Sequence, residues 1–333
     1  MKISTAFEKN MKDLFLLDET LIVFLTRRAT IKNVSACEPS ETKAHQEDEW
    51  NMERTKGQNA MQSQKLMVFV LTMALYGLSS LFTELIPKFQ VGLVEFSVEY
   101  FLFIPLTLAM LFDPMSVALG AATGELVFSE IMLGQFGGLG ELEKFLTVTI
   151  GVYLAGRMVQ DPTNRRMVGI AAITGTALQL LMGMGVDIMK VQFAVEDFEA
   201  VPGLPQSVFA TEGFAFLNDL LFSGTLFCLL PTLFLVPRLH GKIEPLLGMR
   251  PRSAQTGLGG INLRVILAAV LAFAVAAGCE LLATSGMPLI EWEAEWAESG
   301  VALAVGMVVA AAAAVVTLAV LKLRSGKEQV AQR

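Results

Sequence analysis

Histidine and cysteine are scarce in this sequence, and their scarcity excludes several kinds of site. The 333 residues include two histidines, His45 and His240, and three cysteines. Both histidines lie in polar segments that we expect outside the membrane, so neither a zinc site nor a histidine-based catalytic triad can form between the apolar segments. Three cysteines cannot complete a disulfide framework, and Cys228 and Cys279 stand in apolar runs, where cysteine packs as a small hydrophobic residue.

Catalytic and nucleotide-binding motifs are absent as well. Neither H-E-x-x-H, nor G-x-S-x-G, nor G-x-x-x-x-G-K-[ST] occurs in the chain. The stretch GQFGGLGELEKF at 134–145 is therefore interpreted as an external lid or a simple turn, and GMGVD at 183–187 has one residue more than the G-x-G-D of intramembrane aspartyl proteases. We expect no enzymatic activity, no metal and no cofactor, and the net charge of −7 does not suggest nucleic-acid binding.

Charged residues are few and apolar residues abundant. Only 17% of the residues are charged and 53% are hydrophobic, which indicates a membrane protein of the all-α class, a polytopic helix bundle. A spanning helix needs about 20 mostly apolar residues to cross about 30 Å of hydrocarbon. The sequence predicts eight such spans, at Leu66–Ile86, Ser97–Phe112, Met115–Leu133, Phe145–Met158, Met167–Ile188, Phe214–Val236, Ile261–Ala283 and Val301–Leu321.

The charges of the connecting segments predict the orientation of the bundle, because Lys and Arg in short loops are retained in the cytoplasm. The connections at 157–166 and 237–261 and the tail from 322 are basic, whereas those at 190–213 and 284–300 are mainly acidic. This alternation fits eight crossings. It predicts a multi-pass protein of the cytoplasmic membrane with both termini in the cytoplasm.

Composition divides the chain into three regions. Residues 1–60 lack the features of a signal peptide and are expected to form a flexible cytoplasmic extension, unless translation starts at Met52 or Met61. Residues 61–240 carry six of the predicted spans. Residues 241–333 carry a basic loop, two further helices that resemble an appended hairpin, and a cytoplasmic tail.

Two carboxylates lie deep in the third predicted span. At 1.5 Å per residue, Glu125 is about 17 Å and Glu130 about 24 Å from the Asp113-Pro114 turn. Such a group costs a few kcal/mol in a membrane and is kept where it faces a cavity, a partner or a pathway. Five positions correspond to about 140° on an α-helix, so we expect the two side chains on different faces. Glu125 is then the better binding residue and Glu130 reaches the outer interface; for each, a helix–helix hydrogen bond is the alternative.

Other polar residues gather at the same predicted level of the membrane. The candidates for a substrate-binding site are Glu84, Glu95, Glu99, Glu125, Gln179, Asp187, Asn218 and Asp219. They predict a pocket open to the outside beneath the loops at 87–96, 134–144 and 190–213, although Asp187 could simply pair with Lys190. The carboxylates favour a cationic or amine-bearing solute, and the lack of histidine in the spans argues against nickel or cobalt.

Residues 66–236 resemble the substrate-binding S component of energy-coupling-factor (ECF) vitamin transporters. The resemblance rests on VGLVEFSVEYFLFIPLTLAMLFDPMSVALGAATGELV at 91–127. Asp113-Pro114 occupies the turn after the second helix of that family, a Gly/Ala-rich third helix follows, and Glu125 takes the acidic position. The resemblance implies a six-helix core with outer loops over the ligand, to which this chain adds a C-terminal two-helix hairpin.

The same resemblance implies a mechanism and partners. A small solute such as a vitamin or its precursor would be captured from outside, and the bundle would topple in the lipid bilayer to release it inside. Two ATP-binding subunits and a transmembrane coupling subunit would supply the energy. Many members dock on the coupling subunit through an A-x-x-x-A pair in the first helix. Here Ala74 is followed four places later by Leu78, while Gly77 keeps this segment small.

Two other functions compete with this interpretation. In a secondary, ion-coupled transporter, Glu125 and Asp219 would relay protons, although the chain shows no convincing internal duplication. In a non-transporting membrane scaffold, the buried acids would only hold helices together.

Overall fold

The structure, a computed structural model, describes most of the chain after residue 40. The residues described are 41–86, 89–91, 94–96, 101–198, 204–253, 261–286 and 292–293, with side chains in 61–86, 101–198, 204–253 and 261–286. Contacts divide the chain into two units, Met1–Gln58 and Asn59–Arg333. The described part of the first unit is the beginning of helix α2, and everything below concerns the second unit. The predicted span Val301–Leu321 lies outside the described residues.

Helices make up most of the described chain. The α-helices are α2 (Glu41–Glu84), α3 (Phe103–Leu111), α4 (Pro114–Glu125), α5 (Glu141–Met158), α6 (Arg165–Gln192), α7 (Val208–Asp219), α8 (Leu230–Leu239) and α9 (Leu263–Thr284). Two π-helical segments, Leu126–Ile131 and Leu220–Leu229, continue α4 and α7. Short 3-10 turns occupy Gly138–Gly140 and Pro245–Leu247.

Strands are short and pair locally. β1 (Phe89–Val91) and β2 (Val94–Phe96) form an antiparallel hairpin, with Phe89 opposite Phe96. β3 (Gln135–Phe136) pairs antiparallel with β4 (Trp292–Glu293). The expected all-α class is therefore confirmed in its main feature, while the six-helix core with an added hairpin stays a prediction.

Four described helices are long and apolar enough to cross a membrane. They are Met61–Glu84, Arg165–Gln192, Val208–Leu239 and Leu263–Thr284, the third being α7, the second π segment and α8 in one continuous helix. They coincide with the first, fifth, sixth and seventh predicted spans. These four helices are compatible with the expectation that the chain is a membrane protein.

The second predicted span is longer than the helix found there. Helix α3 begins at Phe103 and has nine residues, which extend about 14 Å and cannot cross a bilayer alone. It ends at Leu111 because the backbone of Phe112 is extended. Asp113, the residue before Pro114, is also extended, because a residue before proline avoids the helical region. Asp113 caps α4 by accepting a hydrogen bond from the Ser116 backbone N–H at 2.9 Å.

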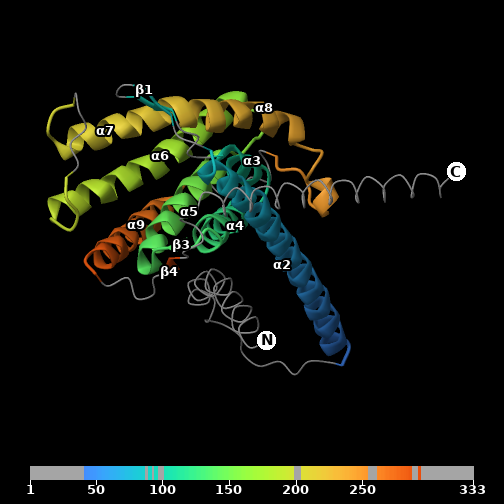
Figure 1. Cartoon of the computed structure of the whole chain (residues 1–333). Helices are drawn as coiled ribbons and strands as arrows, with labels where there is room; N and C mark the ends of the chain where they lie inside the picture. Colours follow the sequence, from blue (N-terminus) through green and yellow to red (C-terminus); the bar gives the residue numbers. More distant parts are fainter. Residues whose placement is uncertain are drawn as a thin grey trace. The chain divides into compact units, whose positions relative to one another are not determined.

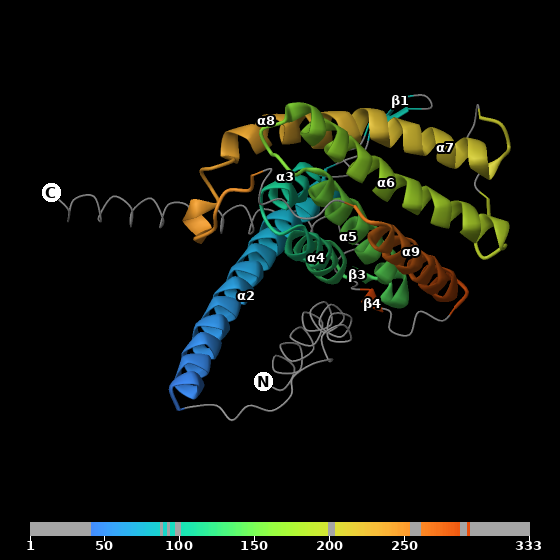
Figure 2. The ribbon, with the colours of Figure 1, turned by 180° about the vertical axis from the view of Figure 1, so that it is seen from behind.

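Helix α5 lies at the centre of the bundle, between α3, α4, α6 and α9 (Figures 1 and 2). It approaches α6 closely at two glycines: a methyl group at Gly151 would lie 2.9 Å from the carbonyl oxygen of Gly175. Helices α2 and α4 meet in the same way, since a methyl group at Gly77 would lie 2.7 Å from the carbonyl oxygen of Gly124. Small residues of this kind let helix backbones approach each other in lipid.

The two residues predicted to dock a partner differ in their surroundings. Gly77 is buried against α4, so its lack of a side chain allows two helices of this chain to pack closely. Ala74, one turn earlier on α2, is half-buried.

Candidate functional site

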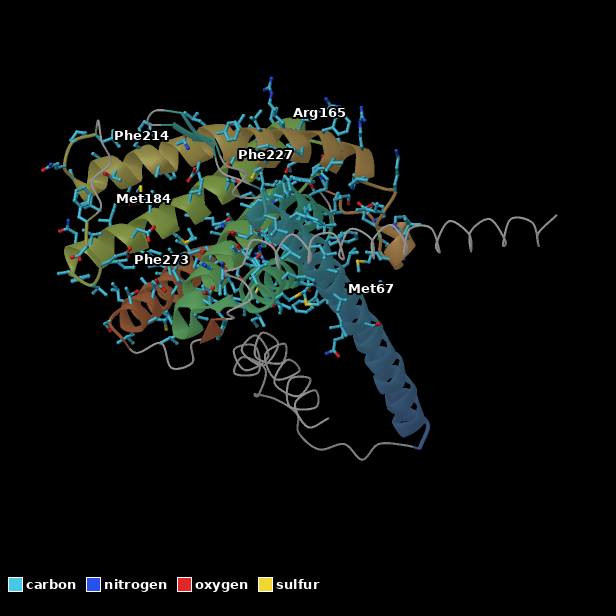
Figure 3. All side chains as sticks on the ribbon, viewed as in Figure 1. Met67, Arg165, Met184, Phe214, Phe227 and Phe273 are labelled. Carbon is cyan, nitrogen blue, oxygen red and sulfur yellow. The ribbon has the colours of Figure 1, made fainter. Side chains whose placement is uncertain are left out.

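A cavity of about 600 Å³ lies at one end of the bundle. Its walls come from the C-terminal parts of α2, α4, α6, α7 and α9, the N-terminal part of α5, and the π segment after α4. In Figure 3 this end carries Met184 on α6 and Phe273 on α9, while Arg165, at the start of α6, marks the opposite end. The cavity thus draws on helices that are far apart in sequence.

Acidic side chains dominate the lining of this cavity. The carboxylates are Glu84, Glu125, Glu130, Glu141, Glu143, Asp187, Glu212, Asp219 and Glu280, and the only basic groups among the lining residues are Lys144 and Lys190. Acids therefore outnumber lysines by seven. Such an excess is costly in a partly buried site unless protons or cations compensate it.

The expectation that Glu125 and Glu130 face different sides was wrong, because both line the cavity. Residues 126–131 are π-helical, as the hydrogen bond of 3.0 Å from the Met132 N–H to the Val127 oxygen shows. In this wider i→i+5 turn, residues five positions apart approach the same face. Glu130 is 8% exposed and belongs to the site rather than to the outer interface.

Lys144 holds the first of two ion-pair clusters. Its Nζ lies 2.9 Å from Glu130 Oε1 and 3.7 Å from Glu141 Oε2. The glycine-rich stretch serves this cluster, because the Gly137 backbone N–H donates to Glu141 Oε1 at 3.1 Å. Glu125 is close enough to Lys144 for electrostatic interaction, yet its Oε2 is buried and has no hydrogen-bond partner among the described residues.

Lys190 holds the second cluster. Its Nζ lies 2.9 Å from Asp187 Oδ1, 3.4 Å from Glu196 Oε2 and 3.5 Å from Glu280 Oε1. The predicted pairing of Asp187 with Lys190 is confirmed, but it is part of a larger network within the cavity. Helix α9, which the sequence suggested as part of an appended hairpin, supplies Glu280 to this network.

Glu143 lies between the two clusters. Both lysines and the carboxylates of Asp187 and Glu280 act on it electrostatically, and its Oε1 is buried without a hydrogen-bond partner among the described residues. Glu143 precedes the predicted span at 145–158. Burial, reinforced by the two neighbouring carboxylates, raises its pKa to about 7.

Most of the predicted binding residues meet in this cavity. Those that line it are Glu84, Glu125, Gln179, Asp187 and Asp219. Asn218 is not among the lining residues, but its Nδ2 lies 3.5 Å from Asp219 Oδ1. The side chain of Glu95, in β2, and the whole of Glu99 lie outside the described residues, so their assignment stays a prediction.

Several lining residues were missed from the sequence. Glu141, Glu143 and Lys144 were regarded only as part of a loop, and Glu280 was overlooked although it is the one charged residue between 265 and 286. A search for single charged residues near the ends of apolar runs would have found it.

Aromatic residues also contribute to the wall of the cavity. Phe101 and Phe216 line it. Phe101 packs edge-on against Phe227, with ring centroids 5.8 Å apart, and Phe227 lies on the π segment after α7 (Figure 3). The cavity therefore combines acidic groups with an apolar aromatic wall.

The opposite end of the bundle is organised around Arg252. This side chain is 8% exposed and donates to the carbonyl oxygens of Gly156 and Val159 at 3.1 Å, of Ala109 at 3.2 Å, and of Phe112. These oxygens belong to the C-terminal ends of α3 and α5, where helical carbonyls lack intrahelical partners and carry partial negative charge. Burial lowers the pKa of Arg252 to about 10, so the guanidinium remains charged at neutral pH.

Comparisons with known proteins identify a family but no function. The sequence profile of a family of unknown function (DUF8171) matches residues 67–331. No curated protein and no solved structure matches the chain. Among the described residues, no group of three or more His, Cys, Asp or Glu side chains is arranged to hold a metal ion.

Proposed function

This chain belongs to DUF8171, a family of unknown function, and we propose that it is a membrane-embedded subunit that captures a small organic cation. The observation that carries the proposal is the cavity of about 600 Å³ in which nine carboxylates face two lysines. Its volume falls within the range of small-molecule sites, roughly 300–1,000 Å³. Acids placed in a predominantly apolar helix bundle mark a binding site or a pathway for a cation.

The lysines of the cavity indicate which kind of cation fits. Lys144 and Lys190 place primary ammonium groups between carboxylates at 2.9–3.7 Å, so the acid clusters already accommodate this chemistry. Phe101 and Phe216 would contact the alkyl or aromatic part of a ligand, and ammonium groups also interact favourably with aromatic rings. A molecule with one or more ammonium groups on a short carbon frame meets these conditions.

The coupling of capture to transport is a further part of the proposal. The resemblance to S components favours an ATP-driven importer of the ECF type, in which this chain binds the solute and partner subunits supply the energy. The cavity lies at the end of the bundle that we predict, from the loop charges, to face the exterior, and capture from outside requires this orientation. An ion-coupled transporter would use the same cavity but would need no ATP-binding partner.

Binding is tested on the purified full chain in lipid nanodiscs by isothermal titration calorimetry. We expect 1,4-diaminobutane to bind, and we expect the neutral analogue 1,4-butanediol not to bind. Glu125→Gln should weaken diamine binding at least tenfold, about 1.4 kcal/mol, because it removes a carboxylate whose Oε2 has no other partner among the described residues. Equal binding of the diol, or no binding of either compound, would contradict the proposal.

A control variant separates the cavity from the general surface charge. Asp197 is exposed and does not line the cavity, so Asp197→Asn removes one negative charge without touching the site and should leave affinity unchanged. If Asp197→Asn and Glu125→Gln lose the same affinity for the diamine, the loss comes from long-range electrostatic attraction and not from contact with the site. The coupling is tested by purification from native membranes in mild detergent: ATP-binding subunits should co-elute, whereas ATP-independent uptake driven by a proton gradient would favour the ion-coupled alternative.

A further inference from the structure

Glu143 is a carboxylate on which the lysines of both clusters act electrostatically. It stands in the first turn of α5, the central helix of the bundle. The charged groups that act on it lie on three helices: Lys144 on α5 itself, Asp187 and Lys190 on α6, and Glu280 on α9. Two of these groups are basic and two are acidic.

The ammonium groups near Glu143 are already bound elsewhere. Lys144 Nζ is 2.9 Å from Glu130, and Lys190 Nζ is 2.9 Å from Asp187 and 3.5 Å from Glu280. The buried Oε1 of Glu143 therefore receives no donor from the described residues. An ionised carboxylate in this position lacks the partners that a buried charge needs.

A proton is the simplest compensation when the cavity is empty. The neutral carboxylic acid avoids repulsion from Asp187 and Glu280 and carries no buried charge. A bound cation offers the opposite compensation, because a positive group beside Glu143 favours its ionised form. Proton and cation thus compete for one carboxylate.

We propose that the cavity takes up its cation in exchange for a proton held by Glu143. The inference rests on the proposed function, since it concerns the same cavity and the same class of ligand. The exchange balances: the O–H bond of the carboxylic acid breaks, the proton passes to solvent, and the carboxylate pairs with the incoming ammonium group. The net charge of the cavity therefore increases by the charge of the ligand minus the one positive charge of the released proton.

The exchange makes affinity depend on pH in one direction. Below the pKa of Glu143 the cation must displace a proton, so the apparent affinity falls by about tenfold for each pH unit, whereas above it the affinity levels off. The change of slope should lie near pH 7, where burial places the pKa of this group. If the cavity opens to the exterior, as the loop charges predict, acidification of the exterior would lower its affinity for the cation.

The state of Glu143 is measured first, without any ligand. Infrared difference spectra of the wild-type chain and Glu143→Gln, both in nanodiscs, isolate the C=O stretch of this carboxyl group. We expect a protonated-carboxyl band at pH 6 in the wild type only, and we expect it to vanish as the pH is raised through about 7. Absence of the band at pH 6 would overturn the inference even if the cavity binds cations.

The exchange is measured second, with 1,4-diaminobutane. At pH 6, binding should remove the band, and calorimetry in two buffers of different ionisation enthalpy should count one proton released for each diamine. Glu143→Gln should release none and should lose the pH dependence, while Asp197→Asn should behave as the wild type. Binding that leaves the band in place would overturn the exchange alone, whereas failure of the diamine to bind any variant would overturn the proposed function with it.

Discussion

The two ends of this bundle differ in how many buried charged groups they leave without hydrogen-bond partners. At one end the guanidinium of Arg252 donates to four carbonyl oxygens from two helices, and a single carboxylate oxygen near it, Glu244 Oε2, is buried without a partner among the described residues. At the other end, carboxyl groups outnumber lysines, and the buried oxygens Glu125 Oε2 and Glu143 Oε1 find no donor among the described residues. The first arrangement ties α3 and α5 together. In the second arrangement the carboxylates lack enough positive partners, so protons or a bound cation must supply the missing positive charge.

The difference suggests a division between stability and function. Groups that are fully bonded stabilise a fold, whereas buried groups left without partners lower stability and persist where a ligand completes them. The π segments fit this division, because one follows Glu125 and the other follows Asp219, both at the acidic end. Such departures from the regular helix are frequent at functional sites.

Removing the guanidinium should have the largest effect on stability. Arg252→Ala leaves the carbonyl oxygens at the ends of α3 and α5 without their donor, and each unsatisfied group costs roughly 1–3 kcal/mol, so we expect a loss on the order of several kcal/mol. Denaturation in detergent, followed by circular dichroism, measures it. Arg250→Ala, at an exposed position two residues earlier, should cost almost nothing. Equal stability of the two variants would refute a bonding role for Arg252.

Close packing of α2 on α4 should give the next largest effect. Gly77→Ala places a methyl group 2.7 Å from the carbonyl oxygen of Gly124, and such overpacking costs about 1–3 kcal/mol. The same substitution at Gly278, in α9, meets no atom within 4 Å and should stabilise its helix by up to about 1 kcal/mol. The two variants should therefore shift the unfolding midpoint in opposite directions. If both variants shift the unfolding midpoint in the same direction, the close contact between α2 and α4 at Gly77 does not limit stability.

Neutralising an acid at the other end should stabilise the empty protein. Because the pKa of Glu143 is raised from its ordinary value of 4.5 to about 7, the folded wild type loses stability as pH rises between these values and stays at the lower level above pH 7. Glu143→Gln avoids this loss. Its melting temperature should exceed that of the wild type by a few degrees at pH 8 and match it at pH 4.5. A variant less stable than the wild type at pH 8 would mean that Glu143 has a structural partner.

The sequence predicted the long apolar helices well because their signal is local. Runs of about twenty apolar residues require no knowledge of neighbours, and four of them recur as helices that could span a membrane. The length of α3 was overestimated because Ser97–Phe112 is apolar enough throughout, while the helix begins only at Phe103. Composition measures hydrophobicity and does not show where backbone hydrogen bonding starts.

The site was predicted in part, for the same reason. Glu125 was found because a carboxylate at that depth is costly whatever surrounds it. The prediction for Glu130 failed because it rests on the 100° per residue of an α-helix, and no residue pattern in the sequence indicates the π segment at 126–131. Glu280 could not be placed beside Lys190 because their meeting depends on which helices pack together, a property of tertiary structure.

The central claim, that the acidic cavity binds an organic cation, is tested most directly by locating one. Crystals of the full chain soaked with 4-bromobenzylamine allow the bromine to be found by its anomalous scattering. The account predicts a bromine peak inside the cavity near Phe101 and Phe216, with the ammonium group toward Glu125, and predicts its loss in Glu125→Gln. A peak confined to the outer surface, or one inside that is equally strong in the variant, would contradict it.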